Sequence, residues 1–215
     1  MNYAQARQAL FQRWIKAVPE YAGKLIADGI IEEALFQKQQ PKVLFITKEA
    51  NDPEQNQWDL TDWLRSGLEG QYAHRLSEWA YGIQNDFPPL EPVSLEDRHF
   101  ALRHTAVITL KKSGGGAQAD HAVLKQHLLK NKPLLLEQIH LIKPDIIIGG
   151  IGKSFYWDLL FDDWAKRSSG YDLAIGTWKG IKVIDFYHPS YRVPRVMQYT
   201  LLASIFRSDA FELLR

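Results

Sequence analysis

The stretch Lys42-Val43-Leu44-Phe45-Ile46-Thr47 decides the fold class. The stretch follows Pro41, and residues 43–46 within it are all apolar, which predicts a strand buried on both faces. Three later segments have a similar character, at residues 105–110, 145–149 and 181–186. Strands of this kind are typical of parallel sheets that helices cover on both sides.

Apolar residues at helical spacing occupy the segments between these strands. The sequence predicts helices over residues 4–18, 21–37, 59–65, 71–83, 120–142, 152–160 and 195–214, with an interruption near Pro133. Alternating strands and helices predict an α/β protein, a three-layer α/β/α sandwich around a central four-stranded, mostly parallel sheet. We expect a single domain over residues 1–215, with residues 1–40 as an N-terminal helical extension.

The composition excludes several classes of protein. The chain of 215 residues is 46% hydrophobic and 24% charged, which is typical of a globular protein and not of a disordered chain, a fibre or a coiled coil. It has no cysteine, which excludes disulfides, zinc ribbons and cysteine-bound iron–sulfur clusters and suits a reducing compartment. Residues 1–10 show no signal peptide, and no apolar run approaches the roughly 18 residues of a membrane span. We expect a cytoplasmic protein without membrane contact, and its net charge of +1 neither requires nor excludes nucleic acid.

Ligands of open α/β sheets bind beyond the carboxyl ends of the strands. That rule selects the loops at residues 48–57, 111–116, 149–152 and 187–194. In the last loop, His188 lies at the rim of the sheet, where an imidazole can stabilise negative charge that develops on a leaving group. Ser190 and Arg192 can contact an anion beside it. The alternative is a loop histidine that is hydrogen-bonded to backbone only.

The first of these loops carries an acid and an amide. The Glu49 carboxylate can position or deprotonate a water molecule, and Asn51 could orient water through its amide oxygen. The alternative is a polar turn in which Asn51 and Asp52 cap the following segment. Trp58 comes after the loop and is either a stacking platform for a nucleobase or a core residue.

Two further loops are rich in glycine. The run Lys111-Lys112-Ser113-Gly114-Gly115-Gly116 places bare backbone amides beside two ammonium groups, which suits phosphate binding; a solvated, flexible turn is the alternative. The segment 149–154 looks like the end of the phosphate loop of NTPases, but Ile147 occupies the position where that motif needs a glycine. Gly149 therefore suits tight packing or the close approach of a ligand to backbone. The histidines have no metal-ligand spacing, so we expect no metal.

The order and spacing of these strands and loops over residues 42–202 resemble the uracil-DNA glycosylase superfamily. Residues 183–192, a strand followed by His-Pro-Ser, resemble its second motif. Residues 45–52 resemble its first motif, which in some branches is a strand followed by Gly-Glu-Ala-Pro-Gly. Glu49 and Ala50 match that motif, and the residues that replace its glycines and proline are Lys48, Asn51 and Asp52. At the end of the middle strand, Leu110 or Thr109 stands where many members carry an asparagine that contacts the uracil edge.

The resemblance implies a DNA glycosylase that removes uracil or another damaged base by hydrolysis of the N-glycosidic bond, in base excision repair. By that resemblance His188 stabilises the departing base anion, and Glu49 or Asn51 orients the water. The residues that would contact the substrate base are Ala50, Trp58, Leu110 and Gly149. The residues that would contact nucleic acid are Lys111, Lys112, Gly114, Pro189, Ser190, Tyr191 and Arg192, with Tyr191 near the wedge that fills the vacated stack.

The partner implied is single- or double-stranded DNA, bound by a monomer that needs no cofactor or metal. Two alternatives stay open. One is a catalytically inactive protein of the same fold that binds nucleic acid or nucleotides. The other is an unrelated α/β hydrolase that acts on small substrates.

Overall fold

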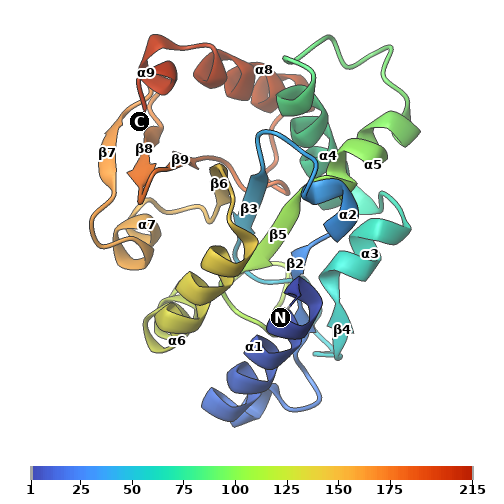
Figure 1. Cartoon of the computed structure of the whole chain (residues 1–215), viewed down its shortest axis with the longest axis vertical. Helices are drawn as coiled ribbons and strands as arrows, with labels where there is room; N and C mark the ends of the chain where they lie inside the picture. The colour runs from blue at the N-terminus through green and yellow to red at the C-terminus, as the bar shows by residue number, and fades with distance from the viewer. Residues whose placement is uncertain (1, 215) are drawn as a thin grey trace.

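Within residues 2–214, which the computed structural model describes, one mixed sheet of seven strands lies at the centre (Figure 1). Its order is β2-β5-β3-β6-β9-β8-β7. The four middle strands are parallel: β5 (Ala106–Thr109), β3 (Val43–Thr47), β6 (Ile146–Gly150) and β9 (Ile181–Asp185). The outer strands are antiparallel to their neighbours: β2 (Gly29–Ile30), β8 (Ala174–Trp178) and β7 (Ala165–Ser168). The prediction of an α/β protein is confirmed, but a sheet of four strands is wrong, because three antiparallel strands extend it.

Helices cover both faces of this sheet. On one face lie α1 (Tyr3–Ala17), the 3-10 helix η1 (Pro19–Tyr21), α2 (Glu33–Phe36), α6 (His121–Ile142) and α7 (Phe155–Leu160). On the other face lie α3 (Leu60–Ser66), α4 (Gly70–Gln84), α5 (Leu95–Arg103), α8 (Arg195–Phe206) and α9 (Asp209–Glu212). A separate pair of short parallel strands joins β1 (Ile26–Ala27) to β4 (Trp58–Asp59).

Alternation along each buried strand produces the two hydrophobic cores. In β3, Leu44 and Ile46 belong to the core under α1 and α6, whereas Val43 and Phe45 belong to the core under α4 and α8. Phe45 is in register with Val107 of β5 and Ile148 of β6, so the same alternation runs across the sheet. Because successive side chains point to opposite faces, an all-apolar strand requires cover on both sides.

The N-terminal region differs from its prediction. Residues 21–37 do not form one helix: they contain part of η1, then β1, β2 and the short α2. Ile26 packs in one core and Ile30 in the other, which the break between β1 and β2 permits and a single helical face does not. Gly29 adopts a φ of +143°, and a Cβ there would lie 2.2 Å from the Tyr3 hydroxyl. The region therefore contributes an edge strand to the sheet, so the expectation of a purely helical extension is wrong.

Three other elements differ from the prediction. The helix α6 runs through Pro133 without interruption, because its buried face packs along its whole length and outweighs the roughly 3 kcal/mol that an internal proline costs. The closing helix ends at Phe206, and α9 begins again at Asp209. The sequence did not predict strand β7, because all four of its residues are exposed and it has no apolar run. Among the described residues, no helix is long and apolar enough to cross a membrane.

Candidate functional site

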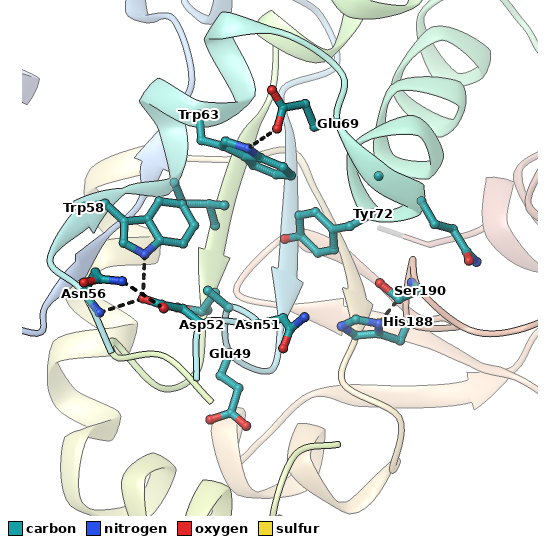
Figure 2. A pocket seen from close by; sticks show the side chains of 15 residues that line it. Glu49, Asn51, Asp52, Asn56, Trp58, Trp63, Glu69, Tyr72, His188 and Ser190 are labelled. Atoms are coloured by element: carbon teal, nitrogen blue, oxygen red, sulfur yellow. Dashed lines mark hydrogen bonds between the residues drawn. The ribbon is translucent and has the colours of Figure 1, made fainter. Parts of the chain in front are cut away.

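A cavity of about 550 Å³ opens beyond the carboxyl ends of β3, β5 and β9 (Figure 2). Its lining comes from the loop after β3, from α3 and α4, from the end of β5 and from the loop after β9. The residues are Glu49, Ala50, Asn51, Asp52, Asn56, Trp58, Leu60, Trp63, Glu69, Gly70, Gln71, Tyr72, Thr109, His188 and Ser190. Five of the site residues predicted from sequence therefore share one cavity with Ser190, which was predicted to contact DNA. A volume of this size suits a small molecule or one nucleobase with its sugar.

His188 is held in one tautomer by its own loop. The backbone N–H of Ser190 donates to Nδ1 of His188 over 3.1 Å, so Nδ1 is the acceptor and Nε2 carries the proton of the neutral ring. Burial, reinforced by the positive charge of Lys48, lowers the pKa of His188 from 6.5 to about 4. Near neutral pH the site therefore presents an uncharged imidazole with one N–H donor.

Asn51 and Glu49 follow the same strand but lie differently. In Figure 2 the Asn51 amide points toward His188, whereas the Glu49 carboxylate points away from both. Lys111 holds that carboxylate, with Nζ 2.5 Å from Oε2, and the same ammonium donates to the Gly114 carbonyl over 2.7 Å. Of the two residues expected to orient water, the structure brings Asn51 rather than the Glu49 carboxylate to the imidazole.

An aromatic wall, Trp58-Trp63-Tyr72, leads along the cavity to His188 (Figure 2). The ring centroids of Trp58 and Trp63 are 6.4 Å apart, those of Trp63 and Tyr72 6.4 Å, and those of Tyr72 and His188 6.1 Å. The Trp58 indole N–H donates to Asp52 over 3.0 Å, which fixes its ring. Aromatic faces of this kind stack on planar heterocycles with little regard to sequence.

Sequence analysis did not identify Trp63, Tyr72 or Gln71. They lie on α3 and at the start of α4, away from any strand end, and only the packing of those helices over the sheet brings them to the cavity. The Tyr72 hydroxyl shares a hydrogen bond of 3.1 Å with Oγ1 of Thr47, at the end of β3. Burial raises the pKa of Tyr72 well above its ordinary value, so the phenol stays neutral. Trp58 was the one residue of this aromatic wall for which the sequence offered a stacking role.

The glycine-rich loop after β5 packs against the loop after β3. The N–H of Gly115 donates to the Ala50 carbonyl over 2.9 Å, and the N–H of Asp52 donates to the Gly115 carbonyl over 3.0 Å. A Cβ on Gly114 would lie 2.1 Å from the Asp52 carbonyl oxygen. Gly114 is buried against protein, so its prediction as a nucleic-acid contact is wrong: the glycines allow two loops to touch.

Lys112 is also wrongly predicted as a nucleic-acid contact. Its side chain is fully buried, and Nζ lies 2.8 Å from both carboxylate oxygens of Asp28. The Asp28 carboxylate accepts three further hydrogen bonds there, from the N–H of Thr109 at 2.7 Å, from the Thr109 hydroxyl at 2.8 Å and from the Gln138 amide at 2.7 Å. Burial lowers the pKa of Lys112, and the adjacent carboxylate opposes that effect. This pair fixes β2 and β5 beneath the site and cannot reach a ligand.

Two residues expected to contact the base belong to the core. Leu110 is fully buried among apolar side chains, and Thr109 lines the cavity in its place. A Cβ on Gly149 would lie 1.6 Å from the Trp157 ring, so this glycine serves tight packing. Those two predictions are therefore wrong, because the alternation of the strands directs the positions to the interior.

The remaining predicted contacts lie at the rim. Ser190, Tyr191 and Arg192 are exposed, and Tyr191 stacks on Tyr187 with ring centroids 5.4 Å apart and an angle of 7° between the planes. Lys111 lies beside the cavity with its ammonium paired to Glu49. Within residues 2–214 there is no group of three or more histidine, aspartate or glutamate side chains arranged to hold a metal ion.

Comparison of the sequence with protein-family models and with curated proteins finds no match. A neutral N–H donor faces an amide across a cavity with an aromatic wall. That arrangement can hold a planar heterocycle, stabilise negative charge on it and orient a water molecule.

Proposed function

We propose that this protein is a DNA glycosylase that hydrolyses the N-glycosidic bond of uracil or another damaged base. The observation that carries the proposal is the neutral His188 imidazole, fixed by the Ser190 N–H and placed opposite Asn51 in the aromatic cavity. A base can enter such a cavity only after its nucleotide leaves the helical stack, which costs a few kcal/mol and favours damaged or mispaired bases. The aromatic wall would offset part of that cost by stacking.

The reaction would proceed through a sugar with oxocarbenium character. As the bond between C1′ and the base nitrogen breaks, its electron pair stays on the base, and the Nε2–H of His188 donates a hydrogen bond to the resulting anion. Asn51 would accept a hydrogen bond from a water molecule on the other side of the sugar, whose hydroxyl adds to C1′ while its proton ends on the released base. The products are a free base and an abasic deoxyribose.

Because its ring is neutral near pH 7, His188 would stabilise the base anion as a hydrogen-bond donor and not as a cation. A donor that is preorganised toward developing charge typically contributes about 10²–10³ in rate, provided that it needs no rearrangement during the reaction. The 3.1 Å bond from Ser190 supplies that preorganisation, because it prevents Nδ1 from becoming the donor in the neutral ring.

The test uses single- and double-stranded oligonucleotides that contain uracil, hypoxanthine or another single lesion, with abasic sites detected by alkaline cleavage. We expect the wild-type protein to cleave at least one of these bases, and His188→Ala to be about 10²–10³ times slower. His140→Ala is a matched control, because His140 is exposed near the end of α6 and lies outside the lining of this cavity. Equal rates for wild type and His188→Ala would remove His188 from the mechanism.

A second candidate function is a protein of this fold that binds nucleic acid without turnover. The observation that favours it is the pairing of Glu49 with Lys111, which takes the acidic side chain of the first loop away from the imidazole. Binding of oligonucleotides without an abasic product from any lesion would favour this candidate over the glycosylase.

A further inference from the structure

A second cavity, of about 480 Å³, lies between α4, α5 and the first residue of α8. Its lining is basic: Arg75 comes from α4, Arg98 from α5 and Arg195 from α8. In Figure 1 these three helices gather on the same side of the sheet, and α4 contacts both of the others. Segments that are far apart in sequence thus bring three guanidinium groups to one place.

The three arginines converge on one carboxylate. Glu78 is 2% exposed, and its Oε1 lies 3.1 Å from Nη1 of Arg98 and 3.2 Å from Nη1 of Arg195. Nη1 of Arg75 lies 3.4 Å from its other oxygen. Among the described residues, Glu78 is the one carboxylate in the lining of this cavity. Three guanidinium charges against one carboxylate leave an excess of positive charge in the lining.

The hydrogen bonds within the cluster leave one N–H group of Arg75 without an acceptor. Its side chain is only 9% exposed, and among the described groups its Nε has no hydrogen-bond partner. A buried guanidinium N–H without an acceptor is costly, and burial lowers the pKa of Arg75. An anion in the cavity would offset the excess charge, and planar guanidinium groups are suited to phosphate oxygens. The cavity also adjoins the N-terminus of the 12-residue helix α8, which favours negative charge.

The cavity is linked to the loop of His188. Gln71 lines both cavities, and its amide nitrogen donates to the carbonyls of Pro189 at 3.4 Å and Tyr191 at 3.1 Å. Nη2 of Arg75 donates to the Val193 carbonyl over 2.9 Å. An anion in the second cavity would therefore lie one loop away from the base cavity.

We propose that the cavity formed by Arg75, Arg98 and Arg195 binds a backbone phosphate of the nucleic-acid strand, next to the extruded nucleotide. The identity of the polymer rests on the proposed function, whereas the anion site rests on the arginine cluster. Binding there would also hold the His188 loop through Gln71 and Arg75, and so join strand binding to the position of the imidazole.

The test measures the affinity for an undamaged oligonucleotide, by fluorescence anisotropy, as a function of salt concentration. Each phosphate contact contributes about 0.9 to the slope of log K against log salt for duplex DNA and about 0.7 for single strands. We expect Arg195→Gln to bind several-fold more weakly, with a slope smaller by about 1. Arg195→Lys should keep most of the slope. Arg167→Gln, on the exposed strand β7, removes the same charge and should match the wild type.

Thermal unfolding first establishes that each variant is folded, which the 43% exposed side chain of Arg195 favours. A wild-type slope in Arg195→Gln would overturn the phosphate site, even if the protein cleaves damaged DNA. A reduced slope without any abasic product would support the phosphate site and count against the glycosylase. Stabilisation by inorganic phosphate that depends on Arg195, without binding of any oligonucleotide, would overturn the assignment to a nucleic-acid strand.

Discussion

The backbone N–H of Ser190 lies 3.1 Å from Nδ1 of His188 and donates to it. This single hydrogen bond determines which ring nitrogen can act on a ligand, because it leaves the proton of the neutral imidazole on Nε2. Ser190 therefore orients the imidazole through its backbone N–H, and this role does not depend on its hydroxyl group. The orientation of the histidine is thus built into the turn that follows β9.

The first prediction concerns pH. The folded-state pKa of His188, about 4, lies below its ordinary value of 6.5, so the neutral ring persists through the range in which a free histidine titrates. We expect the single-turnover cleavage rate to show no titration of His188 between about pH 5 and 8, and to fall only as the pH approaches 4.

The same shift affects stability. The unfolded state binds a proton at higher pH than the folded state, so the contribution of His188 to the free energy of unfolding is present above pH 6.5 and is lost as the pH falls toward 4. Between pH 7 and pH 5, the free energy of unfolding measured with denaturant should fall less for His188→Gln than for the wild type. Nitrogen chemical shifts of the ring that titrate near 6.5 would contradict both expectations.

The second prediction separates Asn51 from Glu49. We expect Asn51→Ala to slow cleavage by about 10²-fold, the lower part of the range for a group that positions the attacking water. Glu49→Gln should keep a cleavage rate within a few-fold of wild type, because its carboxylate is engaged by Lys111. Both rates would be measured in single turnover at saturating protein. The opposite order of effects would assign the water to Glu49.

The third prediction concerns the buried pair of Lys112 and Asp28. Lys112→Met should lower the free energy of unfolding by about 3–5 kcal/mol, because it leaves a buried carboxylate without its cation. The double variant Lys112→Met, Asp28→Asn should recover part of that loss. Urea unfolding of the four proteins completes the cycle. A marginal effect of Lys112→Met would show that the ammonium is solvated and available to ligands.

The fourth prediction compares two adjacent glycines. A Cβ on Gly115 would lie 2.3 Å from the Glu49 carboxylate, whereas on Gly116 its nearest neighbour would be 4.0 Å away. Because the clashing atoms are the end of a flexible side chain, we expect Gly115→Ala to displace Glu49 from Lys111 and to destabilise the protein by about 1 kcal/mol. Gly116→Ala should be within about 0.5 kcal/mol of wild type. Equal stabilities of the two variants, measured by thermal unfolding, would show that the ion pair of Glu49 with Lys111 does not stabilise the two loops.

The prediction of the central strands succeeded because the signal was local. The segments at residues 42–47, 105–110, 145–149 and 181–186 each match a strand of the parallel set to within one residue, since an apolar run buried on both faces has few other structures open to it. The rule that loops gather at the carboxyl ends of parallel strands then placed His188 and Asn51 in one cavity. Residues 21–37 failed because their apolar positions fit a helix equally well.

The sequence by itself determined that the strands are buried on both faces and that two polar loops meet at one edge of the sheet, because these features depend on the order and periodicity of apolar residues. Only the tertiary structure decided which polar side chains face the cavity. It directed Lys112 to Asp28 and Glu49 to Lys111, and it brought Tyr72 and Gln71 over the site from α4. The reason is physical: a buried charge must find a partner, and that partner is chosen by three-dimensional proximity, which no short stretch of sequence specifies.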